Sequence, residues 1–259
     1  PFNLMALALG QPRTGYDDDI RLQMTVDGDH YVINGTEASV PDANIADELL
    51  VVARSPGHAG NNEITMLIVP TNSTGIRQES VKTVACNKES TVAFVDVNVP
   101  KDRVLGRVGG GREILDGVIQ KAAVAKCAEM IGNAEAVLDM TLGYVKQRVQ
   151  FEQVIGSFQA IQDHCVGMAV DIHSARAVTC QAVCSLVSGL AADRDVAFAK
   201  GWVSDAIRRI CDRAHQCHGA VGFTREYDLQ LYTRRAKASA VAFGDGRFYR
   251  DKVANWLDG

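Results

Sequence analysis

Residues 106–112 read Gly106-Arg107-Val108-Gly109-Gly110-Gly111-Arg112, and this Gly-rich connector separates two parts of the chain with different hydrophobic periods. Before the connector the apolar runs are short and rich in β-branched residues. After it, apolar residues recur at intervals of three and four. The first pattern is typical of strands and the second of amphipathic helices. The sequence therefore predicts an α+β protein, with a β domain over residues 1–108 and a helical bundle over residues 109–259.

The β part contains five runs that favour strands. Asp27-Gly28-Asp29 separates the first two runs, and Asp-Gly between two such runs is a strong hairpin signal. Prolines punctuate the later runs. We expect an antiparallel sandwich or barrel of about six to eight strands. The five runs are residues 22–26, 30–34, 49–53, 64–69 and 92–97.

The helical part predicts three long helices followed by two shorter ones. Asp193 and Asp195 are possible N-caps of the third helix, and Gly219 is a natural helix stop. Long helices joined by short loops favour an antiparallel bundle. The expected helices are residues 112–147, 158–188, 193–218, 228–243 and 247–257.

The composition excludes several classes of protein. With 47% hydrophobic and 22% charged residues in 259, the chain is too long and too apolar for a disordered protein. A net charge of −4 disfavours a nucleic-acid or anionic-membrane partner, and no apolar run reaches the ~18 residues of a bilayer span. The first residues lack the basic start of a signal peptide. Seven cysteines without small-domain spacing predict reduced thiols, so we expect a cytoplasmic protein, or a mitochondrial matrix protein if the source is eukaryotic.

Four segments carry more specific patterns: residues 29–35 (DHYVING), 95–100 (VDVNVP), 148–162 (RVQFEQVIGSFQAIQ) and 216–237, which begins QCHGAVGFTREY. Together they resemble the acyl-CoA dehydrogenase family from about residue 10 to residue 257. The family carries a further helical domain before its β domain, and this chain has no counterpart of it, which is consistent with a truncated chain. The resemblance implies an FAD enzyme that oxidises the Cα–Cβ bond of an acyl-CoA thioester.

The resemblance also implies which residues hold the cofactor. By residue matching, Arg148, Gln150 and Phe151 would face the FAD of a neighbouring subunit, and Phe158 and Gln159 would lie near its adenine side. The segment Gln216-Cys217-His218-Gly219-Ala220 would offer backbone N–H groups to a phosphate. Each residue alone also has an ordinary reading: a solvated helix arginine, a core phenylalanine, surface glutamines and a glycine helix stop.

The catalytic positions depart from the family pattern. Phe243 occupies the place of the usual catalytic Glu, and the alternative place on the first long helix falls on Ala122. Asp245 is the remaining candidate for the base, although its place between Gly244 and Gly246 favours a turn or cap role. In the β part, the family's flavin segments become Gly10-Gln11-Pro12-Arg13-Thr14-Gly15-Tyr16-Asp17 and Ser39-Val40-Pro41, which lack the usual hydroxyl and aromatic groups.

These departures predict a subunit that lacks its own catalytic base, in a homo- or hetero-oligomer with acyl-CoA dehydrogenase-like chains. An acyl-CoA thioester would be the substrate and an electron-transfer flavoprotein the electron acceptor. Two alternatives stay open: a homo-oligomeric dehydrogenase that uses Asp245 as base, and a non-catalytic acyl-CoA- or flavin-binding structural partner. We expect no metal, because Cys211, His215 and His218 share a helix face without a second ligand pair.

Overall fold

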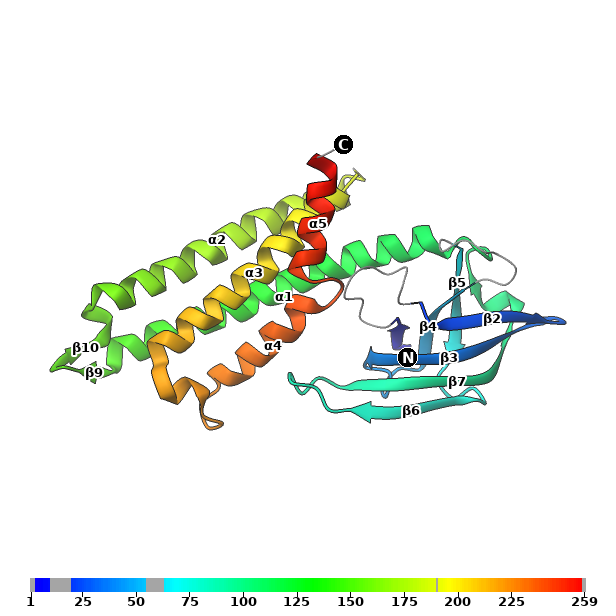
Figure 1. Ribbon diagram of the computed structural model, residues 1–259, viewed down its shortest axis with the longest axis horizontal. Helices are drawn as coiled ribbons and strands as arrows, with labels where there is room; N and C mark the ends of the chain where they lie inside the picture. The colour runs from blue at the N-terminus through cyan, green and yellow to red at the C-terminus, as the bar shows by residue number, and fades with distance from the viewer. Residues whose placement is uncertain (1–2, 10–19, 55–62, 190, 258–259) are drawn as a thin grey trace. The chain divides into compact units, whose positions relative to one another are not determined.

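The computed structural model describes residues 3–9, 20–54, 63–189 and 191–257 (Figure 1). The chain divides into two compact units, Pro1–Ile119 and Gln120–Gly259. Strands dominate the first unit and helices the second, which confirms the expected α+β class.

The first unit contains one eight-stranded sheet in the order β6-β7-β3-β2-β4-β5-β8, with β1 paired to β4. The described path ends at β6 on one side and at β8 on the other, and a short 3₁₀ helix, η1 (Lys101–Arg103), lies between β7 and β8. The strands are β1 (Met5–Ala8), β2 (Leu22–Asp27), β3 (His30–Pro41), β4 (Glu48–Arg54), β5 (Ile64–Pro70), β6 (Ile76–Val81), β7 (Glu89–Pro100) and β8 (Val104–Leu105).

The sheet is mainly antiparallel, as expected, and it also contains two parallel pairings that the sequence did not indicate. The hairpin of β2 and β3 forms at Asp27-Gly28 as expected, but β4 pairs in parallel with both β2 and β1. Parallel neighbours need a crossover connection rather than a tight turn. The short runs of the sequence show where strands lie, but they do not show which neighbour each strand takes.

The long strands β3 and β7 carry irregularities that bend the sheet. Their register shifts between Ile33 and Gly35 and again between Glu37 and Val40. Ser39, inside the second irregularity, has a left-handed φ of 64°. Bulges of this kind increase the local twist of a strand pair.

The second unit is a helical bundle (Figure 1). It contains most of α1, which begins in the first unit, and a two-stranded hairpin, β9 (Val149–Gln150) with β10 (Gln153–Val154), between α1 and α2. Short 3₁₀ helices, η2 (Ile155–Ser157) and η3 (Gly219–Phe223), precede α2 and follow α3. The five helices that the sequence predicted are confirmed as α1 (Gly111–Gln147), α2 (Gln159–Val187), α3 (Asp193–His218), α4 (Leu229–Val241) and α5 (Gly246–Leu257).

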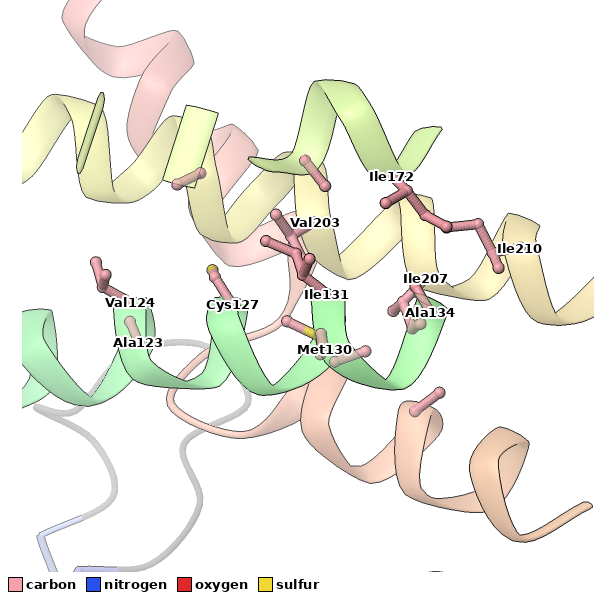
Figure 2. Packing of buried hydrophobic residues seen from close by; sticks show 14 of the residues in the cluster. Ala123, Val124, Cys127, Met130, Ile131, Ala134, Ile172, Val203, Ile207 and Ile210 are labelled. Carbon is pink, nitrogen blue, oxygen red and sulfur yellow. The ribbon is translucent and has the colours of Figure 1, made fainter. Parts of the chain in front are cut away.

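The bundle core lies around α3. Figure 2 shows Ile131 of α1 next to Val203 of α3 and Ala134 of α1 next to Ile207 of α3, and Ile172 of α2 belongs to the same buried cluster. Burying such side chains stabilises the fold by roughly 1.5–3 kcal/mol for each large one.

A buried ionic contact fastens α2 to α3. Asp171 on α2 is 7% exposed, and its carboxylate oxygens accept hydrogen bonds from Arg209 at 2.7 Å and from Arg213 at 2.6 Å. A Cβ atom at Gly167 would lie 2.8 Å from the guanidinium carbon of Arg213, so a larger residue there would displace the end of this arginine side chain.

Candidate functional site

The turn between β9 and β10 has an unusual backbone. Phe151 and Glu152 occupy the turn, and both have left-handed φ angles, 53° and 64°. Two consecutive left-handed residues define the turn that two-residue hairpins favour, but the usual residues are Asn and Gly. A bulky residue in this region is an outlier, and such strain of about 1–3 kcal/mol per residue clusters at functional sites. Phe151 is nevertheless 86% exposed, so its own packing does not explain the turn.

Arg148 lies just before this hairpin and is held there by its backbone. Its N–H donates to the carbonyl of Tyr144 at 2.9 Å, and its own carbonyl accepts from the N–H of Ile155 at 2.8 Å. The side chain is exposed, and within the described residues its guanidinium makes no hydrogen bond or ion pair. Arg148 thus presents a positive charge to solvent, three residues before the exposed ring of Phe151.

The start of α2 lies against the hairpin. The ring of Phe158 meets that of Phe151 edge to face, with centroids 6.2 Å apart. Phe158 also stands at the N-cap of α2, where no side chain caps the helix, and Gln159 is the exposed first helical residue. Gln150 is exposed and donates only to the carbonyl of Val149, at 2.9 Å.

The end of α3 completes this end of the bundle. Cys217 and His218 are both 4% exposed, whereas Gln216 and Ala220 face solvent. Gly219 ends the helix with a φ of 63°, and its N–H already donates to the carbonyl of His215. Of the expected phosphate donors in this segment, the Gly219 amide is therefore used by the fold itself.

His218 is held as a neutral imidazole. Its Nδ1 lies 2.8 Å from the carbonyl of Ala214, which can only accept, so Nδ1 carries the proton. Its Nε2 then accepts from the hydroxyl of Tyr227 at 3.1 Å, and the ring stacks on Tyr144 with centroids 4.6 Å apart. Burial lowers the pKa of His218 below its ordinary value, in agreement with this pairing.

A small hydrophobic cluster joins these segments. Cys217 packs with Val145 and Ile155, and Phe158 and Cys165 lie against them. The structure therefore brings all ten sequence-predicted cofactor residues to one end of the bundle, where α1 ends, the β9–β10 hairpin turns, α2 begins and α3 ends (Figure 1). The sequence did not indicate that His218 stacks on Tyr144 and is hydrogen-bonded to Tyr227, because these contacts join separate elements.

Asp245 lies elsewhere, in the connection from α4 to α5. Its Oδ1 accepts from the N–H of Phe248 at 2.8 Å, so it caps α5. Phe243 has a left-handed φ of 57° and is fixed by the hydroxyl of Tyr249, which donates to its carbonyl at 2.8 Å. Neither Phe243 nor Ala122 carries a group that accepts a proton.

A buried lysine supports this connection. Lys200 on α3 is fully buried, and its ammonium donates to the carbonyls of Gly244 at 2.9 Å and Ala240 at 3.0 Å, and to the hydroxyl of Ser204 at 3.0 Å. Burial lowers the pKa of Lys200 to about 8. The ammonium therefore satisfies carbonyls at the end of α4 and beyond it, and the path of residues 242–246 depends on it.

In the first unit only one of the two expected flavin segments lies among the described residues; residues 10–17 lie outside them. Ser39 has the left-handed φ noted above, and its hydroxyl donates to the carboxylate of Glu89. Val40 is fully buried, and Pro41 pairs with Glu89 in β7. The Ser39 hydroxyl is therefore already hydrogen-bonded to a residue of the neighbouring strand β7.

The spacing of Cys211, His215 and His218 does not form a ligand set. Cys211 is buried, His215 is hydrogen-bonded to Thr233 at 2.8 Å, and His218 is engaged as described. Across the described part of the chain, no three His, Cys, Asp or Glu side chains are grouped as metal ligands. Among the helices described, none has the length and hydropathy that a membrane span requires.

Known proteins share this fold and are similar to this chain in sequence. The family model described as "Acyl-CoA dehydrogenase, C-terminal domain" matches residues 109–257. The chain is 31% identical to a probable acyl-CoA dehydrogenase of Bacillus subtilis, over 98% of this chain and 68% of that protein. It is 29% identical to the short/branched chain specific acyl-CoA dehydrogenase of Bos taurus, over 89% of this chain but only 54% of that protein. The chain therefore spans about half the length of the bovine relative.

Solved structures of dehydrogenases also superpose closely on this chain. The butyryl-CoA dehydrogenase of Megasphaera elsdenii superposes with a TM-score of 0.93 at 27% identity, covering 99% of this chain and 68% of that chain. A structure titled as an FAD-dependent dehydrogenase superposes with a TM-score of 0.92 at 25% identity, covering 99% of this chain and 70% of that chain. With a family model that covers more than half of its residues and relatives along nearly all of its length, the chain belongs to the acyl-CoA dehydrogenase family.

Proposed function

We propose that this chain is a subunit of an FAD-dependent enzyme that acts on the Cα–Cβ bond of an acyl-CoA thioester, and that its hairpin end binds the FAD of a neighbouring subunit. The observation that carries the proposal is the exposed Arg148 at the start of the strained turn that holds Phe151. The guanidinium of Arg148 has no partner among the described residues, and the ring of Phe151 is 86% exposed although it contacts Phe158 edge to face.

The residues at this end fit a cofactor that is both anionic and aromatic. A guanidinium binds phosphate through charge-assisted hydrogen bonds, and the rings of Phe151 and Phe158 offer aromatic surface beside it. Gln150, Gln159 and Gln216 are exposed around them and can donate or accept hydrogen bonds. When bound, FAD would supply the hydride acceptor of the reaction; this chain's own residues hold its phosphates and cover its ring systems.

In this proposal, another chain removes the α proton of the substrate. A general base must lie within hydrogen-bond reach of that proton and must have a group that can accept it. Phe243 has no such group, and the carboxylate of Asp245 is committed to the N-terminus of α5. A catalytically complete assembly would then pair this chain with an acyl-CoA dehydrogenase-like chain that has the base.

An electron-transfer flavoprotein is the acceptor that the family resemblance implies for the reduced flavin. All seven cysteines are free thiols in the structure, which supports a reducing compartment such as the cytoplasm or the mitochondrial matrix.

A flavin-reduction experiment tests the proposal. The purified chain is titrated with FAD, its absorption spectrum is recorded, and acyl-CoA thioesters are added first without and then with a candidate second chain. We expect flavin to be bleached only when the second chain is present. Bleaching by this chain alone would instead establish the homo-oligomeric enzyme with its own base, and bound flavin that is never bleached would establish a non-catalytic binding partner.

A further inference from the structure

Two thiols meet inside the bundle, close to the start of α2 and the end of α3. Cys165 lies on α2 and Cys217 on the last turn of α3, and both belong to the small hydrophobic cluster that contains Val145 and Ile155. The thiol of Cys217 donates a hydrogen bond to the sulfur of Cys165. Both cysteines are free, so this is a contact between two reduced thiols.

The packing of α2 against α3 leads to the same contact independently. Asp171 on α2 is hydrogen-bonded to Arg209 on α3 at 2.7 Å. One turn nearer the hairpin, Gly167 lies against the guanidinium of Arg213. A step back along α2 thus corresponds to an equal step forward along α3, as in neighbouring antiparallel helices with the same rise. Carried to the hairpin end, this register places Cys165 opposite the last turn of α3, where the second thiol lies.

The two thiols differ in their access to solvent and in their acidity. Cys165 is half-buried, whereas Cys217 is 4% exposed. Burial, together with the charge of an ionised Cys165 beside it, raises the pKa of Cys217 to about 12. Burial also raises the pKa of Cys165, but the hydrogen bond from Cys217 opposes this rise. A small oxidant from solvent therefore reacts first with Cys165, the more accessible thiol and the one that ionises more readily.

We propose that Cys165 and Cys217 are a redox-active pair, which a peroxide converts into a disulfide between α2 and α3. The thiolate of Cys165 attacks one oxygen of the peroxide and the O–O bond breaks. Cys165 becomes a sulfenic acid, and the other oxygen leaves as water or an alcohol with the proton that Cys165 released. The sulfur of Cys217 then attacks the sulfenic sulfur, the S–S bond forms, and the hydroxide that leaves takes the proton of Cys217 as water. The two thiols lose two electrons, and these two electrons reduce the peroxide.

The surroundings of the pair favour the disulfide once it has formed. Low thiol pKa values stabilise the reduced form of a pair and make its disulfide a strong oxidant, so raised pKa values have the opposite effect. Because Cys217 is shielded by the cluster, a thiol reductant reaches the disulfide through Cys165. The disulfide therefore forms slowly, persists, and is reversed by reductants that attack at one sulfur.

The disulfide joins two elements that carry predicted cofactor residues. Gln159 is the first residue of α2, and Gln216 precedes Cys217 in the last turn of α3. A cross-link from residue 165 to residue 217 closes a long loop, and such a loop favours the folded state because it restricts the unfolded chain. Oxidation thus fastens this end of the bundle without altering a predicted cofactor residue other than Cys217.

A peptide map of the purified chain tests the proposal. Trypsin cuts after Arg148, Arg176, Arg213 and Arg225, so each of the two cysteines falls in a peptide with no other cysteine. The reduced protein is treated with hydrogen peroxide, its remaining thiols are blocked with N-ethylmaleimide, and the digest is analysed by mass spectrometry. We expect peptides 149–176 and 214–225 as one linked species, which dithiothreitol separates.

Variants assign the two roles. In Cys217→Ala we expect Cys165 to stop at the sulfenic acid, which dimedone traps, and in Cys165→Ala we expect Cys217 to stay reduced. The matched control is Cys211→Ala, which removes a thiol of similar burial from the same helix and should leave the linked peptides unchanged. A wild-type chain in which the exposed Cys86 is oxidised but the linked peptides do not form overturns the proposal, as does a linkage of Cys165 to a different cysteine.

Thermal unfolding gives a second readout. We expect the midpoint of the oxidised wild type to lie roughly 10 °C above that of the reduced protein, as for a cross-link that closes a long loop in a chain of this size. The shift should vanish in Cys165→Ala, whose half-buried position makes it the safer variant if Cys217→Ala does not fold. An equal shift in Cys165→Ala would contradict the proposal. Neither experiment needs FAD or an acyl-CoA, so the disulfide can fail while flavin binding at the hairpin end succeeds, and the reverse.

Discussion

The Oδ1 atom of Asp245 accepts a hydrogen bond from the backbone N–H of Phe248 across 2.8 Å, and this contact makes Asp245 the N-cap of α5. The N–H that it satisfies is one of the four that a helix leaves without an internal partner. The residue that seemed the best remaining base in the sequence is thus explained by the fold.

Replacing Asp245 separates these two roles. Asp245→Asn keeps a capping side chain, so we expect the free energy of unfolding and the activity of the assembled complex to stay nearly unchanged, whereas Asp245→Ala should cost about 1 kcal/mol of stability. Urea denaturation and acyl-CoA-dependent flavin reduction measure the two effects. An Asp245→Asn complex that is folded and FAD-loaded but at least a hundredfold slower would identify a base instead of a cap.

Glu152 offers a test of the strained hairpin. Its φ of 64° is one that glycine adopts freely. We expect Glu152→Gly to raise the free energy of unfolding by about 1 kcal/mol, because the gain from the relieved turn exceeds the entropy that glycine loses. Thermal and urea denaturation measure it, with Glu226→Gly as a control on an exposed residue; a destabilised Glu152→Gly variant would show that the turn is not strained.

Lys200 should make stability depend on alkaline pH. Its pKa is about 8 in the folded chain against an ordinary value of 10.5, so between these values the unfolded chain holds a proton that the folded chain has released. Stability from this group therefore rises as the pH rises from 8 toward 10.5, by about 2 kcal/mol between pH 7.5 and 9.5.

The variant Lys200→Met checks this. It leaves the carbonyls of Ala240 and Gly244 without their donor, which should cost about 2 kcal/mol or more at pH 7.5. The difference between wild type and variant should then widen as the pH rises to 9.5. Urea denaturation at both pH values gives that difference, and a constant difference would mean that Lys200 does not titrate in this range.

His218 should make stability fall in acid. Burial lowers its pKa in the folded chain, so below the ordinary value of 6.5 the unfolded chain takes up a proton that the folded chain refuses. Stability is full above pH 6.5 and is lost as the pH falls below it. His218→Phe keeps a ring against Tyr144 but cannot be protonated, so we expect a smaller loss of stability between pH 7 and pH 5 than in wild type. His215, whose pKa is also lowered, accounts for the remainder, and an unchanged slope in the variant would exclude a role for His218.

The fold was predictable where periodicity decides it. The helix at residues 193–218 is found with those bounds because Gly219 stops it, and the other four helices differ by a residue or two at their ends. The strands β1, β6 and β8 were missed because they are short or lie at the border of the sheet, where no apolar alternation marks them. The parallel partners of β4 were missed because register between distant segments is set by packing, which a single sequence does not display.

The sequence predicted which residues form the site, but not their backbone conformation or their hydrogen bonds. Motif order placed Arg148, Phe151 and Gln216 at one end of the bundle, and the structure brings them there. The left-handed turn at Phe151 was not predictable, since Phe-Glu is not a turn dipeptide. The commitment of the Gly219 amide to His215, and of Asp245 to Phe248, depends on hydrogen-bond geometry that only the folded chain reveals.

The central claim is that the hairpin end of this bundle binds FAD through Arg148, and the FAD affinity of Arg148→Ala tests it most directly. The guanidinium has no partner among the described residues and the side chain is exposed between α1 and the hairpin, so the fold should survive the change. We expect the dissociation constant for FAD, from quenching of flavin fluorescence, to rise roughly ten- to a hundredfold, as for the loss of one charge-assisted hydrogen bond. Arg247→Ala, at an exposed arginine on α5, should leave it unchanged. A folded Arg148→Ala protein that binds FAD as tightly as wild type would contradict the account.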